Sequence, residues 1–275
     1  MRRAPFRVLP GFGPSLGVTL FVVSTVVVIP LGGLFVKASG LSATEAIAQL
    51  TSFRVAAAFR LSFGLAFVAA LVNGIIGLAT AWVLERYEFP GRRILDALVD
   101  LPFALPTAVA GITLAALYAN DGWIGALLHP FGIAVSYTRS GIFLALVFVG
   151  LPYVIRTLQP VLADVAHEAE EAALTLGARA GQVFFRIILP PLIPALLSGV
   201  ALAFARGVGE YGSVIFIAGN MPGKTEILPL VIVTELEQFN DAGAALQAGA
   251  MLITAFAVLL LINLLGLWSR RRHGA

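Results

Sequence analysis

The chain has 275 residues, of which 59% are hydrophobic and 12% are charged. Soluble domains carry about 25% charged residues, so the composition excludes a soluble domain and places the chain in a lipid bilayer. The net charge of +3 comes without a basic patch interleaved with aromatics, which argues against nucleic acid, and the absence of cysteine excludes disulfides and thiolate metal sites.

The first two apolar segments follow a basic N-terminus. Residues 16–36 reach the roughly 20 apolar residues that a bilayer span needs. This run exceeds the roughly 7 to 15 residues of a signal-peptide core, and Lys37 is unsuited to a cleavage site, so we expect an uncleaved span. Residues 61–84 form the second expected span, in which Gly74 and Gly77 allow close helix approach.

Four further apolar segments bring the expected number of spans to six. They are residues 97–118, a span that we expect Pro102 and Pro106 to break, and residues 141–158, 192–217 and 244–267. With the N-terminus in the cytoplasm, segments on that side hold 12 of the 18 basic residues, five face outward and one lies within a span. This bias agrees with the positive-inside rule, so both termini are expected in the cytoplasm. We predict an all-α polytopic membrane protein with a single transmembrane domain, residues 1–275.

Residues 164–190 form a polar segment between the fourth and fifth spans. Its apolar positions have the spacing of one helix face: Val165, Ala169, Ala172 and Leu176. The opposite face is polar: Glu168, Glu171 and Thr175. Gly177 can take the left-handed conformation that ends a helix, and residues 182–189 form a second short amphipathic run. The pattern predicts a helix-turn-helix along the cytoplasmic membrane surface.

One pair of opposite charges lies within the expected fifth span. Arg206 and Glu210 are four residues apart, so they share a helix face and offset each other's cost of leaving water. Two interpretations carry similar weight. The pair lines a polar pathway for an anion, or it is an internal ion pair that only stabilises the helix bundle.

Other motifs do not support an enzyme. The segment 219–225 resembles a phosphate-binding loop but has three residues between its glycines instead of four, and the glycines at 207, 209 and 212 match a dinucleotide-binding pattern inside a span. The histidines are scattered, and Asp96 and Asp100 are interpreted as solvated or helix-start charges at the membrane boundary. We therefore expect no catalytic residues, no metal site and no cofactor.

The polar segment resembles the EAA loop in the membrane subunits of bacterial ABC importers. The match comprises Glu171-Ala172-Ala173, Gly177 and the run Ile187-x-Leu189-Pro190 at the family spacing. In that family the loop is a cytoplasmic coupling helix that docks into a separate ATPase subunit. The resemblance therefore implies that Glu171, Ala172, Ala173 and Gly177 contact such a subunit.

Two further stretches resemble the sulfate and thiosulfate permease family, and the likeness covers nearly the whole chain. They are residues 100–111, Asp-Leu-Pro-Phe-Ala-Leu-Pro-Thr-Ala-Val-Ala-Gly, and residues 206–220. Molybdate permeases share the architecture and a similar Gly-Glu-Tyr/Phe-Gly stretch. The resemblance implies an inner-membrane permease subunit of an ATP-driven importer that performs no chemistry itself. Its implied partners are ATPase subunits, a second, homologous permease chain and a periplasmic binding protein.

We expect the anion pathway to lie near the prolines of the third span and the charged pair of the fifth. The candidate residues are Pro102, Pro106, Thr107, Arg206 and Glu210. A permease for another oxyanion such as molybdate remains an alternative, as do a passive anion channel and a membrane-embedded enzyme. The sequence does not separate sulfate from thiosulfate, or a homodimer from a heterodimer.

Overall fold

A computed structural model of the protein describes residues 12–165 and 167–272, and within these residues every regular element is a helix. The elements are α1 (Phe12–Val23), the π-helix η1 (Ser24–Val28), α2 (Ile29–Ala38), α3 (Ala43–Thr51), α4 (Phe53–Arg86), α5 (Arg92–Val99), α6 (Leu101–Ala104), α7 (Thr107–Tyr118), α8 (Gly125–Leu128), the 3-10 helix η2 (His129–Phe131), α9 (Arg139–Asp164), α10 (His167–Thr175), α11 (Ala180–Val183), the π-helix η3 (Phe184–Ile188), α12 (Leu189–Val208), α13 (Val214–Ile217), α14 (Leu228–Glu237) and α15 (Asp241–Arg272).

Five helices in the described residues are long and apolar enough to cross a membrane. They are Phe12–Ala38, Phe53–Arg86, Arg139–Asp164, Ala180–Val208 and Asp241–Leu264. Each overlaps one of the six expected spans. The boundaries differ most in the fifth, which ends at Val208 instead of residue 217.

The expected third span, residues 97–118, is not one continuous helix. It is divided among the end of α5, the single turn of α6 and the 12 residues of α7, which alone reach about 18 Å. Pro106 has no N–H and forces the preceding residue out of the helical region, and Leu105 is extended with ψ 134°. The third expected span is therefore broken at its prolines, as predicted.

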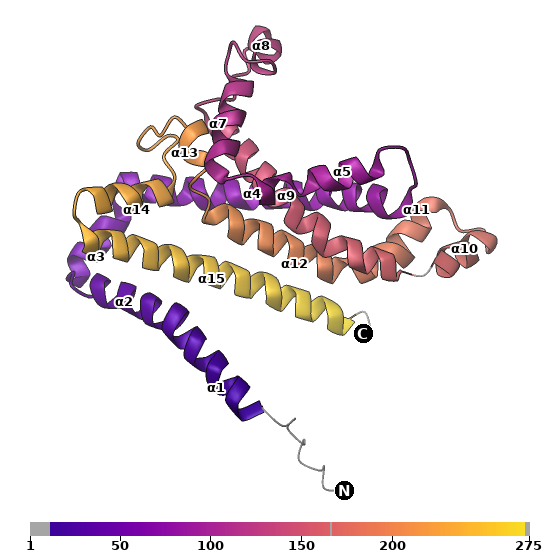
Figure 1. Cartoon of the computed structure of the whole chain (residues 1–275), viewed down its shortest axis with the longest axis horizontal. Helices are drawn as coiled ribbons and strands as arrows, with labels where there is room; N and C mark the ends of the chain where they lie inside the picture. The colour runs from indigo at the N-terminus through magenta and orange to yellow at the C-terminus, as the bar shows by residue number, and fades with distance from the viewer. Residues whose placement is uncertain (1–11, 166, 273–275) are drawn as a thin grey trace, which may run out of the picture.

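The centre of the molecule is a bundle of α4, α9 and α12 (Figure 1). Val154 of α9 is fully buried between Gly77 of α4 and Gly199 of α12. A Cβ on Gly77 would lie 2.7 Å from Cγ1 of Val154, and one on Gly199 would lie 3.0 Å from its Cα. The absence of side chains at both glycines lets three backbones approach closely, as predicted for Gly77.

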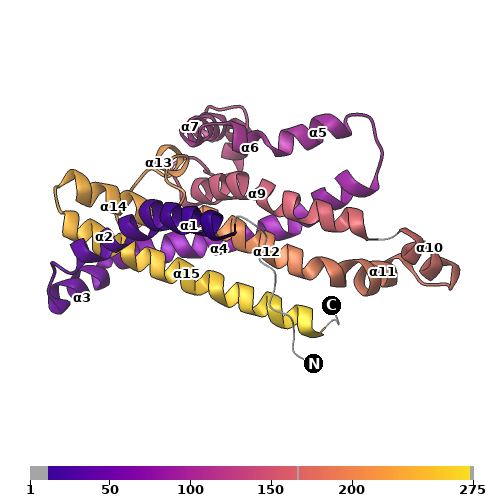
Figure 2. The same cartoon turned by 60° about the horizontal axis from the view of Figure 1, so that its bottom comes forward.

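Further helices pack around this bundle. α15 lies along α12 and also contacts α2 and α14, as both views of the chain indicate (Figures 1 and 2). α3 and α14 lie at one end of the bundle and α10 lies at the other (Figure 1). The helical run from α1 to α2 has no buried residue and diverges from the bundle toward α1 (Figure 1).

The segment from α7 to η2 projects sideways from the bundle, and α8 lies at its tip (Figure 1). We call residues 107–131 the lateral arm. The base of the arm contacts α13 and α9, while Trp123 and Phe131 are strongly exposed. The Ser136 hydroxyl also donates to the carbonyl of Ala115 at 2.7 Å, so α7 is held as far as Ala115, while the tip of the arm is exposed.

Candidate functional site

The polar segment of residues 164–190, which we call the coupling segment, folds as α10, a turn, α11 and η3. The helix begins at His167, two residues later than the first predicted apolar position, Val165. α10 is fixed to the bundle through Arg86, the last residue of α4. The Arg86 Nη2 donates to Glu170 Oε1 at 2.7 Å and to the backbone oxygen of Val165 at 3.1 Å. Both side chains of this ion pair are largely buried, so the end of α4 and the start of α10 are joined firmly.

Gly177 ends the helix as predicted. Its φ is +85°, the left-handed region, and the N–H of Ala178 donates to the carbonyl of Ala173 at 3.0 Å. A Cβ on Gly177 would meet no atom within 4 Å. The glycine is required by the backbone conformation and by nothing else within this chain.

The apolar face predicted for α10 is not covered by the described residues. Ala169, Ala172 and Leu176 are exposed, and Leu176 is 88% exposed. Instead, Glu170 and Ala173 turn toward the bundle, because the ion pair with Arg86 sets the rotation of the helix. Glu171 is exposed as expected. The apolar face thus remains uncovered in this chain.

A second candidate site lies where α12 ends. After Val208 the chain leaves the helix and turns through Gly209–Ser213 before α13, and we call these residues the elbow. Glu210 lies in the elbow, beyond the helix, yet its Oε2 accepts from Arg206 Nη1 at 2.6 Å. The predicted ion pair therefore forms, although one partner lies outside the helix whose face they were expected to share.

The two members of this pair are held differently. The side chain of Glu210 is 1% exposed, and its Oε1 accepts from both the N–H and the hydroxyl of Ser213, at 2.7 and 2.8 Å. The Arg206 side chain is 31% exposed, and the pair with Glu210 uses one of its guanidinium nitrogens. Glu210 is therefore the anchored member, and Arg206 has donors left for another acceptor.

The base of the lateral arm packs directly on the elbow. A Cβ on Gly212 would lie 2.2 Å from the Thr107 hydroxyl, and one on Gly111 would lie 2.3 Å from the backbone oxygen of Ser213. The structure thus brings Thr107 and the neighbouring Pro106 beside the elbow that holds Glu210. Pro102 belongs to α6, the short helix that precedes α7 in the chain, and α6 packs against α9.

Sequence reasoning missed a charge cluster around Arg156 of α9. Its Nε and Nη2 donate to the two carboxylate oxygens of Asp100 at 2.8 and 2.6 Å, and its Nη1 donates to Asp96 at 2.7 Å. Gln159 also bonds both Arg156 and Asp96. The two aspartates are interpreted from the sequence as solvated or helix-start charges. Asp100 is indeed the N-cap residue of α6, and both side chains are nearly half exposed, but through Arg156 they also attach α5 and α6 to α9. The i, i+4 spacing of Asp96 and Asp100 was visible in the sequence, but their partner 56 residues away was not.

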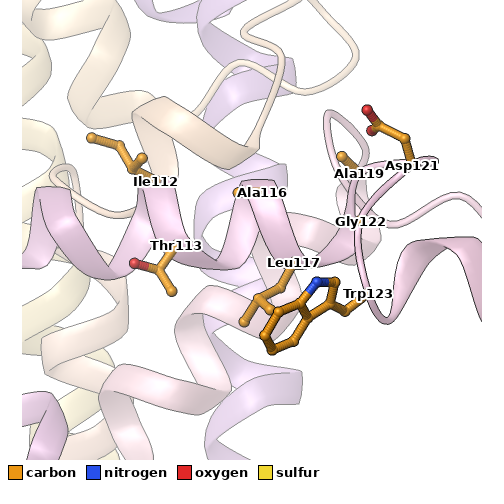
Figure 3. A pocket seen from close by; sticks show the side chains of 8 residues that line it. All are labelled: Ile112, Thr113, Ala116, Leu117, Ala119, Asp121, Gly122 and Trp123. Carbon is orange, nitrogen blue, oxygen red and sulfur yellow. The ribbon is translucent and has the colours of Figure 1, made fainter.

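A hollow of about 640 Å³ lies along the lateral arm (Figure 3). The side chains of Leu117 and Trp123 lie beside each other there, and Asp121 points away from them (Figure 3). Trp123 is 86% exposed. The hollow contains one charged residue, so it offers an apolar surface and no evident ion site.

The described residues contain no group of three or more His, Cys, Asp or Glu side chains that could hold a metal ion. The glycine pattern at 207, 209 and 212 lies at the end of α12 and in the elbow, with no strand before it. Neither feature supports a nucleotide or metal site in this part of the chain.

Comparison with solved structures identifies the fold. A crystal structure of a bacterial ABC transporter involved in the import of the acidic polysaccharide alginate has a chain that matches with a TM-score of 0.74, 15% identity and 96% coverage of both chains. A second structure, of the bacterial alginate transporter in complex with a periplasmic protein bound to an alginate pentasaccharide, matches with a TM-score of 0.73 and 17% identity over 94% of this chain and 93% of the other. The fold is that of the membrane-spanning part of an ABC transporter.

Sequence comparison defines the family. The model of the binding-protein-dependent transport system inner membrane component matches residues 73–273, and the chain belongs to this family. The sulfate transport system permease proteins CysT of Salmonella typhimurium and Escherichia coli are each 48% identical over 94% of this chain and 94% of their own length. A probable sulfate transport permease of Nephroselmis olivacea is also 48% identical, over 89% of this chain and 86% of its own. These relatives confirm the predicted resemblance to the sulfate permeases.

Proposed function

We propose that this chain is the membrane permease subunit of an ABC importer and forms part of the translocation pathway for sulfate. The observation that carries the proposal is the 48% identity to two sulfate transport permease proteins over 94% of the chain. In the proposed orientation both termini and α10 face the cytoplasm. The sixth crossing is made by the divided segment α5–α6–α7 together with protein that covers it.

ATP is bound and hydrolysed on separate ATPase subunits that dock on α10 and the Gly177 turn. The exposed face of Ala169, Ala172 and Leu176 supports this assignment, since nothing in this chain covers it. The ion pair of Arg86 with Glu170 supplies a stiff connection from the docked helix to α4. Movement of the ATPase subunits would therefore reach the bundle as a rigid-body displacement.

A second permease chain completes the pathway, and a periplasmic binding protein delivers the anion. The lateral arm supports a second membrane chain, because Trp123, Leu127 and Phe131 are all exposed on it. A large exposed apolar surface of this kind marks contact with protein or lipid. The arm carries Thr107 at its base, so the same element that meets the partner also contacts the elbow.

Arg206 presents donors to the anion while Glu210 holds it in place. A dianion crossing the bilayer must exchange water for other donors, and a guanidinium offers several in a planar fork. Because Glu210 is bound to Ser213 as well, the carboxylate stays anchored when Arg206 turns toward the substrate. A permanently tight ion pair would leave Arg206 little attraction for an anion, but the anchored carboxylate allows Arg206 to turn away from it.

The test uses the reconstituted importer with its ATPase and binding protein. Arg206→Gln is expected to lower sulfate uptake at least tenfold while leaving assembly and basal ATPase activity near the wild-type level. Arg60→Gln, a basic residue on α4, is the matched control and is expected to transport normally. Thiosulfate and molybdate as competitors distinguish the substrate class.

Charge exchange separates the pathway role from a structural one. If Arg206→Glu with Glu210→Arg restored transport, the pair would only stabilise the bundle and the pathway role would be rejected. Loss of assembly in Arg206→Gln would lead to the same conclusion.

A further inference from the structure

An apolar groove lies between α4 and the continuous helical run of α11, η3 and α12. Its volume is about 900 Å³, and its lining includes Leu71, Leu78 and Trp82 on one side and Phe184, Phe185 and Val200 on the other. Phe184 packs edge-on against Trp82, with ring centroids 5.4 Å apart. No charged residue lines the groove, so a sulfate ion would find no donor there.

The groove has the length of one membrane leaflet. From Leu71 to Trp82 the helix rises about 16 Å, at about 1.5 Å per residue. The hydrocarbon core of a bilayer is about 30 Å thick, so one leaflet takes up about 15 Å of it. Trp82 lies at the end of the groove nearest α10, where an aromatic side chain belongs at the membrane–water interface.

Two basic residues lie next to the groove at that end. Arg179 directly precedes the lining residue Ala180, and Arg186 directly follows the lining residue Phe185. Both are exposed, and neither forms a salt bridge within the described residues. The sequence from Leu176 to Pro191 contains no carboxylate, so the α11–η3 side of the mouth is cationic, whereas the α4 side carries both Glu85 and Arg86.

The mouth of the groove is open at Gly181, one of its lining residues. A Cβ on Gly181 would meet no atom within 4 Å, which leaves room for a headgroup between α11 and α4. An apolar slot one leaflet deep, with a basic mouth at the interface, matches the shape and charge of an anionic phospholipid. A transmembrane helix of a partner chain would fill the slot but leave both arginines without a counter-charge.

We propose that this groove binds an anionic phospholipid from the cytoplasmic leaflet, with one acyl chain in the slot and the phosphate beside Arg179 and Arg186. The orientation rests on the proposed function, which places α10 in the cytoplasm. The lipid would pack against η3, the last helical element that lies wholly within the segment 164–190. It would thus support the start of α12, the helix that carries Arg206 and ends at Val208.

The test is lipid retention by the assembled importer, measured by native mass spectrometry after purification in detergent with added phosphatidylglycerol. Ala79→Phe fills the groove from α4, and Ile76→Phe on the same helix, outside the lining, is its control. Arg179→Gln with Arg186→Gln removes the basic mouth, and Arg93→Gln on the same expected side is the control.

Each basic side chain beside an anionic membrane strengthens binding about fivefold, so loss of both arginines is expected to weaken retention about 30-fold. Ala79→Phe is expected to abolish the bound lipid, and both controls are expected to keep it. Equal retention in all variants would overturn the proposal. So would retention of phosphatidylcholine as strong as that of phosphatidylglycerol.

A photo-crosslinker at position 79 distinguishes lipid from a protein helix. Crosslinking to phospholipid supports the proposal, and crosslinking to a second permease chain overturns it. Sulfate uptake is measured on the same samples. Normal uptake without bound lipid would reject the lipid site and leave the transport function intact, whereas bound lipid without any sulfate-dependent uptake would reject the function and leave the site.

Discussion

The Gly177 turn offers a way to separate backbone strain from contact with an ATPase subunit. Gly177 has φ +85°, and a Cβ there would lie in open space within this chain. A residue with a Cβ pays about 1–2 kcal/mol in the left-handed conformation, and asparagine pays less than alanine or valine. Strain alone therefore predicts that Gly177→Ala weakens any process that needs the turn by about 5- to 30-fold. Gly177→Asn should have a smaller effect.

A close fit of the turn into a partner predicts a larger loss of ATPase binding than backbone strain alone. If the turn fits closely into a cleft on the ATPase subunit, Gly177→Val is expected to weaken ATPase binding further than Gly177→Ala, since its extra methyl groups meet the partner. Gly91 provides the matched control. Its φ is +91°, its Cβ would also meet nothing within 4 Å, and it lies outside the coupling segment.

The assay is binding of the purified ATPase subunit to the permease in nanodiscs, with sulfate-dependent ATP hydrolysis measured in parallel. We expect Gly177→Val to lose binding and Gly91→Val to keep it, with both proteins inserted in the membrane at normal levels. Wild-type binding and transport in Gly177→Val would refute the reasoning. Equal losses in the two valine variants would assign the effect to strain and remove the evidence for a cleft.

Three further predictions concern topology and stability. Single cysteines replacing Glu88 and Asn120, both exposed, are expected to react with an impermeant thiol reagent only from the cytoplasmic and only from the external side respectively; the reverse would contradict the orientation. Asn73→Leu is expected to raise the thermal unfolding temperature, because both side-chain polar atoms of Asn73 are buried without a partner at a cost of about 1–3 kcal/mol; a lower temperature would indicate a bound water or ligand there. Asp100→Asn is expected to cost about 0.5–1 kcal/mol in unfolding experiments, because it removes one of the two half-exposed carboxylates paired with Arg156; an unchanged midpoint would show that the cluster does not hold α5 and α6.

The long apolar spans could be predicted from sequence because a run of 20 apolar residues has few alternatives. Five of them are present, and the role of Gly77 in close packing was also foreseen. The break in the third span was predicted from its prolines, since the effect of Pro106 on Leu105 follows from sterics. Hydropathy averages over a window and does not register a single kink.

The rotation of α10 could not be predicted in the same way. Periodicity identifies an apolar face but not what covers it, and here the ion pair of Glu170 with Arg86, 84 residues earlier, turns that face outward. The Arg156 cluster was missed for the same reason, because its partners come from separate helices. The unequal anchoring of Arg206 and Glu210 depends on Ser213 and on the end of α12, neither of which the spacing of the two charges reveals.

The extended backbone at Leu105 divides the third apolar segment into two helices, α6 and α7, that are attached to different parts of the chain. Below it, α6 is fastened to α9. Above it, α7 packs on the elbow at Gly111, and the Ser136 hydroxyl donates to the Ala115 carbonyl at 2.7 Å, so the arm is held as far as Ala115. The tip beyond Ala115 is exposed at Trp123, Leu127 and Phe131. A partner that displaces this tip would therefore act on Thr107 and the elbow through a single helix of 12 residues, about 18 Å long.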